Sequence, residues 1–288
     1  MFPPRAALMD NEITIRRAES LADYRACQDA QRKAWGITEE GYVIPVATMV
    51  GANLHGGLVL GAFLAGETAV AMSFGFLGRL EERLCLYSQL TGVVPSYQSR
   101  GLGYAVKIVQ RSMAHAEGLG LIAWAFDPLQ AGNAYFNLNR LGARVHRYID
   151  NMYGERTDAL NAGVPTDRLI AEWEIDSLNL PQPGETPGPN AKATLPRLIR
   201  TGRNPEGRLV PLGVQTSANA PRVLLEVPPR IADLMRDQPE AAEAWRLAVR
   251  QAFQASFAAG YHAVGLVRDE SSGERRCYYE LDRPEGRG

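Results

Sequence analysis

The sequence has few cysteines, no long uninterrupted apolar run and almost no net charge. Its three cysteines, Cys27, Cys85 and Cys277, are widely spaced and odd in number, which excludes a disulfide framework and a CxxC metal or redox site. A formal net charge of -1 gives the chain no overall attraction to nucleic acid or to an anionic membrane, so neither partner is expected. No metal is expected either, because no ligand spacing links its histidines, which are His55, His115, His146 and His262.

The segments that could indicate export or a membrane span are short or interrupted. Residues 1–12 contain no apolar run of signal-peptide length. The apolar stretch at 57–78 is broken by turn residues at 65–67, and it is therefore predicted to be a β-hairpin with strands at 58–64 and 68–76. A cytoplasmic location fits these features and the unpaired cysteines.

Apolar periodicity and turn residues predict strands that alternate with helices, which indicates an α/β sheet. Besides the hairpin, strands are predicted at 11–17, 83–94, 121–126, 145–153 and 169–175. Helices are predicted at 21–34, 46–54 and 131–141, and over the segment after Gly103 whose apolar face contains Ala105, Val106, Val109, Met113 and Ala116.

The most specific segment joins the strand at 83–94 to the helix that follows it. It reads Gln98-Ser99-Arg100-Gly101-Leu102-Gly103. A turn from a strand into a helix directs unpaired N–H groups and the positive end of the helix dipole toward an anion. Gly101 and Gly103 let phosphate oxygens approach, and Arg100 adds a charge-assisted hydrogen bond. A Rossmann site is excluded because Val106 stands at the third glycine position, and the Gly-Lys-Ser/Thr of a nucleotide P-loop is missing.

With the residues before it, this segment resembles the cofactor loop of the GNAT superfamily of acyl-CoA-dependent N-acyltransferases. The family pattern is Val-x-Pro-x-Tyr-Arg-x-x-Gly-x-Gly, and the sequence here reads Val93-Val94-Pro95-Ser96-Tyr97-Gln98-Ser99-Arg100-Gly101-Leu102-Gly103. The resemblance covers residues 12–175. It implies a GNAT-type mixed sheet of about seven strands flanked by helices, in which the fourth and fifth strands separate to admit the pantetheine of CoA.

The same resemblance implies which residues hold acetyl-CoA or another acyl-CoA. Val93 and Val94 would pair with the pantetheine amides through their main chains. Gln98, Ser99, Arg100, Gly101, Leu102 and Gly103 would surround the pyrophosphate. Asn133 would bond the amide arm of the cofactor or cap its own helix. Lys107 and Arg111 would reach the adenosine phosphates or form a solvated helix face.

The usual proton-transfer residues of the family are missing. Many members carry the acid on a tyrosine of the helix after the fifth strand, where Leu138 stands here. Tyr135 and Tyr153 are the candidate replacements, with a packed aromatic as the alternative for each. The strand at 84–92 contains no carboxylate, so Asp127 is the candidate base or substrate contact, and a capped Asp-Pro turn is its alternative role.

The chain is predicted to divide into an acyltransferase domain at 1–178 and a smaller α+β unit at 179–288, with a linker at 180–190. The second part is predicted to hold strands at 222–227, 263–267 and 277–281 and an amphipathic helix at 239–259, whose apolar stripe must be covered. It is expected to dock on the acyltransferase domain or on a second copy in a homodimer. Its arginines are expected to form a solvated loop or to attract an anion, and they are Arg197, Arg200, Arg203 and Arg208.

These observations predict an N-acyltransferase that moves an acyl group, acetyl or another such as succinyl, from CoA to a primary amine. The acceptor is expected to be a small metabolite such as an amino acid. Two alternatives remain open at this point: a CoA-binding sensor or interaction module with reduced catalysis, and a protein acetyltransferase.

Overall fold

The computed structural model describes residues 7–8, 13–65, 67–154, 165–175, 195–216, 220–271 and 273–283. They divide into two compact units. The first unit holds the described residues up to 124 together with 174–175, and the second holds 125–154, 165–173 and the described residues from 195 onward. The domain boundary predicted after residue 178 stays a prediction, and the predicted linker at 180–190 lies outside the described residues.

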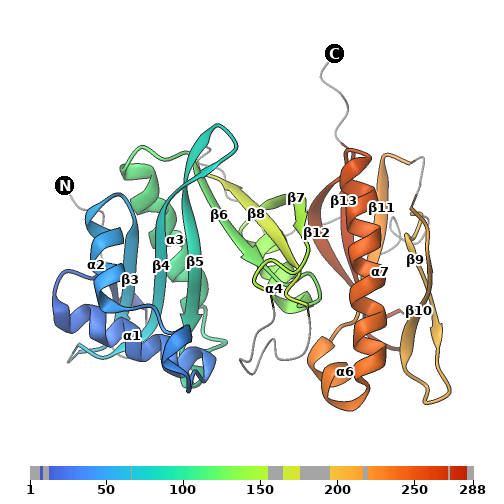
Figure 1. Cartoon of the computed structure of the whole chain (residues 1–288), viewed down its shortest axis with the longest axis horizontal. Helices are drawn as coiled ribbons and strands as arrows, with labels where there is room; N and C mark the ends of the chain where they lie inside the picture. Colours follow the sequence, from blue (N-terminus) through green and yellow to red (C-terminus); the bar gives the residue numbers. More distant parts are fainter. Residues whose placement is uncertain are drawn as a thin grey trace. The chain divides into compact units, whose positions relative to one another are not determined.

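The first unit is built on strands that are hydrogen-bonded in the order β1-β2-β3-β4-β5-β6 (Figure 1). Pairing is antiparallel from β1 to β5 and parallel between β5 and β6, as expected of a mixed sheet. The predicted hairpin is confirmed as β3 and β4. The strand bounds are β1 (Ala7–Leu8), β2 (Ile13–Arg17), β3 (Leu58–Phe63), β4 (Ala69–Leu80), β5 (Arg83–Val93) and β6 (Leu121–Phe126).

Helices cover both faces of this sheet. The helices α1 (Leu21–Trp35) and α2 (Val46–Leu54) pack on one face, and α3 (Leu102–Ala116) packs on the other (Figure 1). Two consecutive residues of β4 show this: Met72 belongs to the cluster beneath α1, whereas Ser73 accepts a hydrogen bond from Gln110 of α3. Because consecutive side chains of a strand point to opposite faces, the two sets of helices lie on opposite sides.

Local sequence determines where α1 begins and ends. Ser20 caps its first turn by accepting from the N–H of Asp23, while the Asp23 carboxylate accepts from the N–H of Ser20, and each of these bonds measures 3.1 Å. This reciprocal arrangement satisfies two of the N–H groups that a helix start leaves unpaired. Gly36 ends the helix in the left-handed region, at φ 61°, where a residue with a Cβ is strained.

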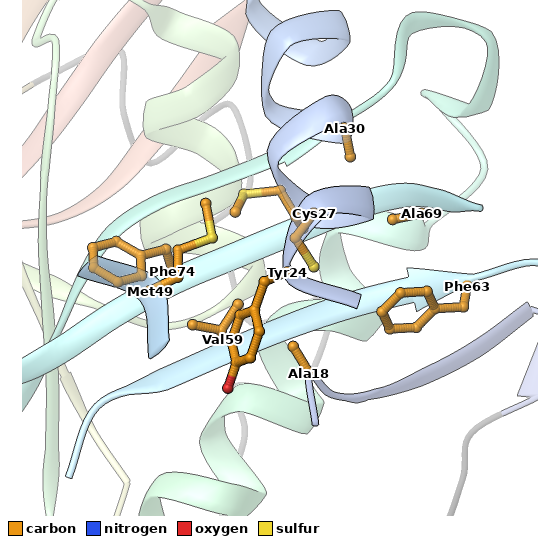
Figure 2. Close-up of a cluster of buried hydrophobic side chains, with 10 residues drawn as sticks. Ala18, Tyr24, Cys27, Ala30, Met49, Val59, Phe63, Ala69 and Phe74 are labelled. Carbon is orange, nitrogen blue, oxygen red and sulfur yellow. The ribbon is translucent and has the colours of Figure 1, made fainter. Parts of the chain in front are cut away.

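Figure 2 shows the apolar cluster that joins α1 and α2 to the sheet. Helix side chains at one-turn spacing meet apolar side chains of β3 and β4, which is the pattern of an amphipathic helix on a sheet. Its buried members are Ala18, Tyr24, Cys27, Ala30, Met49, Val59, Phe63, Ala69, Met72 and Phe74. Cys27 is therefore a core residue, and burial raises the pKa of its thiol to about 12.

The second unit has a five-stranded antiparallel arrangement in the order β8-β7-β12-β13-β11, and a separate hairpin of β9 and β10. The strand bounds are β7 (Arg144–Ile149), β8 (Arg168–Glu174), β9 (Ile199–Arg203), β10 (Leu209–Val214), β11 (Arg222–Val227), β12 (His262–Asp269) and β13 (Arg276–Asp282). Its α-helices are α4 (Ala131–Tyr135), α6 (Ile231–Asp237) and α7 (Pro239–Ala258).

The apolar stripe predicted on the long C-terminal helix is covered within this second unit. The Trp245 indole donates to the carbonyl of Leu209 at 3.0 Å, and the Phe253 ring lies 5.9 Å from that of Tyr148 and 5.0 Å from that of Tyr279. Trp245 and Phe253 are fully buried. The stripe therefore packs in a core that it shares with β7 and β13. These two strands lie on opposite sides, in sequence, of the boundary predicted after residue 178.

Two sequence predictions for the second unit need correction. Part of the arginine-rich segment around 197–208 forms strands where a loop was expected, because Arg203 pairs with Leu209 and Arg200 with Gly213 in the β9–β10 hairpin. All four arginines are nevertheless exposed, and Arg208 lies in the turn between the two strands. The helix predicted at 131–141 is present, but after Tyr135 it widens into a π-helical turn at Phe136–Arg140. In that turn the N–H of Leu141 donates to the carbonyl of Phe136 at 3.0 Å, five residues back.

Candidate functional site

The loop between β5 and α3 is held in shape by its own hydrogen bonds. After the short turn η2 (Pro95–Tyr97), the Gln98 side chain folds back and donates to the carbonyl of Val93 at 3.0 Å. Ser99 and Gly101 both adopt positive φ angles, of 63° and 79°. For Ser99 this conformation is strained, and such strain is found most often where a loop serves a ligand.

The start of α3 has the features of an anion site. Its N-cap is Gly101, and no side chain caps it, so the first N–H groups of the helix point out of its end. Leu102 anchors the turn in the core, and Arg100 lies exposed beside the Tyr97 ring, at 5.7 Å. Among the described residues no heavy atom lies within 4 Å of a Cβ built on Gly101, so the space in front of the helix end is open. An uncapped helix start of this kind favours an anion.

The strand that leads to this loop is paired with β4 along its second half, but among the described residues it has no partner there on its other edge. β5 pairs with β6 only at Leu86 with Ile122 and Tyr87 with Ala123, although β5 continues to Val93 (Figure 1). We call the place beyond these pairs the fork between β5 and β6. An extended ligand arm entering from the α3 end would find main-chain groups of β5 there.

The pairing register decides which of these main-chain groups face the fork. The N–H of Val94 donates to the carbonyl of Val70 at 2.9 Å, so Val94 faces β4. Backbone groups alternate sides along an antiparallel strand, and Val93 and Thr91 therefore face away from β4. Of the two valines expected to pair with pantetheine, Val93 has the required direction through its N–H, since its carbonyl already accepts from Gln98. The N–H of Val94 is engaged by Val70.

A buried polar cluster lies where β5 and β6 separate. The ammonium of Lys107 on α3 donates to Ser88 Oγ at 3.0 Å and to Gln110 Oε1 at 2.9 Å, and it stands 4.0 Å from the centre of the Trp124 ring. The cluster continues because Gln110 donates to Ser73 Oγ at 2.8 Å. Lys107 is only 4% exposed. It therefore neither lies on a solvated helix face nor extends toward adenosine phosphates, which were the two sequence-based alternatives.

The opposite face of the same strand borders a cavity of about 510 Å³. Ser88 contacts Lys107 of α3, whereas the next residue, Gln89, lines this cavity. The cavity lies between the segment that joins α1 to α2 and the strands β4 and β5. Its walls contain no ionisable group other than the Tyr42 phenol, and they are formed by Gly41, Tyr42, Val43, Ile44, Pro45, Thr48, Ala52, Phe74, Phe76 and Gln89.

Asp127 belongs to the second unit, and its carboxylate is engaged there. It accepts from the N–H of Leu129 at 2.9 Å and from the two terminal nitrogens of Arg246 at 3.2 and 3.0 Å. The capped turn, which was the alternative to a catalytic role, is thus present. The role of Asp127 as a base or substrate contact stays a prediction.

The two tyrosines and the asparagine predicted for the site also belong to the second unit. Tyr135 is half-buried under the guanidinium of Arg268, which lies 4.3 Å from its ring centre. Tyr153 is 36% exposed, and its N–H donates to Thr166 Oγ1 at 2.9 Å. Asn133 is exposed and accepts from Asn137 at 3.4 Å. Their catalytic and cofactor-binding roles stay predictions.

Over the described ranges the structure holds no group of three or more metal-ligating side chains. In the same part of the chain, no helix is both long and apolar enough to cross a bilayer.

Comparison with known proteins gives similarities at the level of structure alone. The sequence matches no family model and no curated protein. Its structure is similar to that of an N-acetyltransferase acting on a ribosomal-protein alanine from Escherichia coli, with 17% identity, a TM-score of 0.45 and coverage of 60% of this chain and 97% of the other. A putative acetyltransferase from Salmonella typhimurium, solved with acetyl-CoA, has 18% identity and a TM-score of 0.45, and the match covers 59% of this chain and 98% of the other. An N-acetyltransferase from Staphylococcus aureus has 11% identity and a TM-score of 0.46, and the match covers 57% of this chain and 99% of the other.

At these identities and scores, the comparisons describe architecture and carry no conclusion about activity. The matches span less than two thirds of this chain.

Proposed function

We propose that this protein transfers an acyl group from CoA to a primary amine of a small molecule. The observation that carries the proposal is the continuous path formed by the uncapped start of α3, the loop at 98–103 and the second half of β5, which pairs with β4 on one edge and leaves its other edge without a partner strand among the described residues. The start of α3 suits a pyrophosphate, and the outward-facing main chain of Thr91 and the N–H of Val93 suit the amides of an extended arm. Acyl-CoA supplies an activated thioester, and the protein supplies its position.

The position of the cavity supports the transfer reaction. It borders β5 at Gln89, one residue beyond Ser88, where the strand leaves β6. An acyl carbon held in the fork would therefore lie next to the cavity, and an amine bound in the cavity could approach it from the face that carries α1 and α2. Holding both reactants in this way lowers the entropic part of the barrier.

The cavity walls favour an amine with an uncharged, apolar body. The lining is dominated by Tyr42, Val43, Ile44, Phe74 and Phe76, and it contains no lysine, arginine or histidine. The carboxylate of a free amino acid would find no cationic partner among these walls, so it would gain no charge-assisted hydrogen bond there. We therefore propose an arylalkylamine or alkylamine as the acceptor, in preference to the amino acid expected from the sequence.

Two measurements test the proposed function. Calorimetry with CoA should give saturable binding, and acetyl-CoA with 2-phenylethylamine should release CoA thiol faster than acetyl-CoA with phenylalanine or with a lysine-containing peptide. Absence of CoA binding to the folded protein would overturn the proposal. Binding without turnover on any amine would favour the sensor or interaction module, and turnover on the peptide alone would favour a protein acetyltransferase.

A further inference from the structure

Lys107 marks the point at which β5 and β6 part. Its two contacts across the sheet are Ser88, the first residue of β5 after the paired Tyr87, and Trp124, the first residue of β6 after the paired Ala123. The ammonium therefore lies at the apex of the fork, on the face covered by α3. A ligand arm running along β5 from Val93 toward its last paired residue would end near this group.

In the described part of the chain, the surroundings of Lys107 are polar but carry no opposite charge. The groups that face it are Ser88 from β5, Trp124 from β6 and Gln110 from its own helix, and Gln110 links it to Ser73 of β4. None of these titrates near neutral pH. The charged neighbour on its helix is Arg111, whose guanidinium donates to the carbonyl of Ile175.

Burial without a counter-ion makes Lys107 able to exchange a proton near neutrality. Desolvation disfavours the ammonium form and lowers the pKa of Lys107 to about 7. An ordinary lysine would hold its proton too firmly to donate it at this pH, because its pKa lies near 10.4. The three hydrogen atoms of the ammonium are directed at two oxygen acceptors and an aromatic ring, so the cation is still well accommodated when it forms.

The side of the sheet on which Lys107 lies suits the leaving group better than the attacking amine. Gln89 faces the acceptor cavity, and Ser88, which receives the Lys107 hydrogen bond, faces the other way. When the amine attacks from the cavity side, the sulfur that leaves is the atom accessible to the Ser88 side. A thiolate leaves more readily when a positioned acid protonates it.

We propose that Lys107, acting through the Ser88 hydroxyl, supplies the proton taken up by the departing CoA sulfur. This inference rests on the proposed acyl transfer. In the step, the amine nitrogen bonds to the acyl carbon, the carbon–sulfur bond breaks, and its electron pair goes to sulfur. Ser88 passes its proton to the sulfur and takes one from Lys107, and the proton released by the new amide nitrogen restores the ammonium by way of solvent. The products are amide and CoA thiol, with no net gain or loss of protons.

The first test measures the ionisation of bound CoA thiol by its ultraviolet absorbance as the pH is raised, and it needs no acceptor. With Lys107 beside the sulfur, the ammonium and the thiolate stabilise each other and titrate as a pair, so thiolate should begin to form at a lower pH in the parent than in Lys107→Met. Lys107→Gln should behave like Lys107→Met, because neither side chain can carry the charge. The glutamine amide can still donate hydrogen bonds in the cluster, so this variant separates loss of charge from loss of hydrogen bonding. The exposed lysine variant Lys33→Met should behave like the parent.

The second test follows kcat with acetyl-CoA and 2-phenylethylamine across pH. Because the donor must be protonated, kcat should fall as the pH rises through about 7 in the parent, and this fall should be absent in Lys107→Gln, which should turn over about 10² to 10⁴ times more slowly. Direct titration of the lysine side chains by NMR is practicable, since the chain has three lysines, Lys33, Lys107 and Lys192.

The outcomes separate this inference from the proposed function. If CoA binds the parent and all the folded variants ionise its thiol at the same pH, the role of Lys107 is overturned and the acyltransferase proposal stands. The role of Lys107 is equally overturned if NMR shows that its side chain titrates with the midpoint pH of an ordinary lysine. If the folded parent does not bind CoA, the proposed function itself fails.

Discussion

Arg246 of α7 holds both carboxylate oxygens of Asp127, a residue 119 positions earlier in the chain. The arginine side chain is 5% exposed and the aspartate side chain 17%. The pair fixes the turn after β6 to the twenty-residue helix of the second unit. A candidate catalytic carboxylate thus has a structural partner that no local sequence pattern indicates.

Arg246→Met should destabilise the second unit by about 3 kcal/mol, because it leaves the Asp127 charge largely buried without its partner. The matched control is Arg275→Met, which removes an arginine from an ion pair with Glu270 in which both side chains are 61% exposed. That control should leave the free energy of unfolding nearly unchanged. Urea denaturation of the three proteins measures the difference, and equal midpoints for the two variants would contradict the structural role of Arg246.

Gly101→Val should weaken CoA binding by more than about tenfold, since the added side chain enters the space in front of α3 where an anion would bind. The control lies at the other end of the same helix. Gly118 has almost the same φ angle, 80° against 79°, and a Cβ there also meets no atom of the described part within 4 Å.

Gly118→Val should therefore introduce similar backbone strain, about 1 to 2 kcal/mol, while CoA affinity is kept. Calorimetry on both folded variants makes the comparison. Parent-like affinity in Gly101→Val would place the pyrophosphate elsewhere.

Asp23→Asn should reduce the acid sensitivity of the first unit. The guanidinium of Arg16, which contacts the Asp23 carboxylate at 2.7 Å with both terminal nitrogens, holds the pKa of that carboxyl well below its usual range. Because the pKa of Asp23 is lower in the folded protein than in the unfolded chain, its ionisation stabilises the fold at pH values above the unfolded-state pKa of about 4. This stabilisation is lost as the pH falls from there toward the folded-state pKa. The free energy of unfolding should drop by roughly 2 kcal/mol more in the parent than in Asp23→Asn between about pH 7 and about pH 2.

The control for this prediction is Asp29→Asn on the same helix. The Asp29 side chain is 65% exposed in its pair with Arg32, so its removal should leave the acid dependence unchanged. Urea denaturation at several pH values gives the curves. A parent-like acid dependence in Asp23→Asn would show that other carboxylates cause it.

Thr48→Arg should shift acceptor preference toward amines that carry a carboxylate. Thr48 lies on the cavity wall, so an arginine there would provide the missing cation, and the KM for phenylalanine should fall relative to that for 2-phenylethylamine. Ala47→Arg adds the same charge at the neighbouring exposed position, which does not line the cavity. If both variants change the KM ratio equally, the cavity does not hold the acceptor.

Local patterns predicted most elements of the fold because each depends on neighbouring residues. The bounds of α2, β6 and β11 coincide with the predicted ranges, and the loop at 98–103 lies between a strand and a helix as its resemblance implied. The hairpin of β9 and β10 was missed because its strands contain arginines and glycines in place of an apolar alternation. Strand pairing outweighed composition there.

The face that α3 buries was predicted less accurately. The apolar residues expected on it included Val109 and Ala116, but the buried positions are Leu102, Val106, Lys107, Gln110 and Ala114. Two of the buried positions on α3 are polar, Lys107 and Gln110. A prediction from apolar residues alone therefore placed the buried face of the helix too far to one side. Lys107 lies four residues from Gly103, Gln110 lies four residues from Ala114, and the two are three residues apart, which places all four on one face of the helix. That spacing was the sequence signal for their burial.

The sequence by itself determined the local machinery of this protein: the glycine turn at the start of α3, the caps of α1 and the order of strands and helices. These follow from φ angles, capping and periodicity, which act over a few residues. Tertiary structure alone decided that Lys107 is buried at the apex of the fork, that Asp127 is held by Arg246, and that an apolar cavity borders Gln89. Each of these depends on which side chains meet across strands and helices far apart in the chain, where desolvation and packing, which local propensity does not encode, set the charge and contacts of a group.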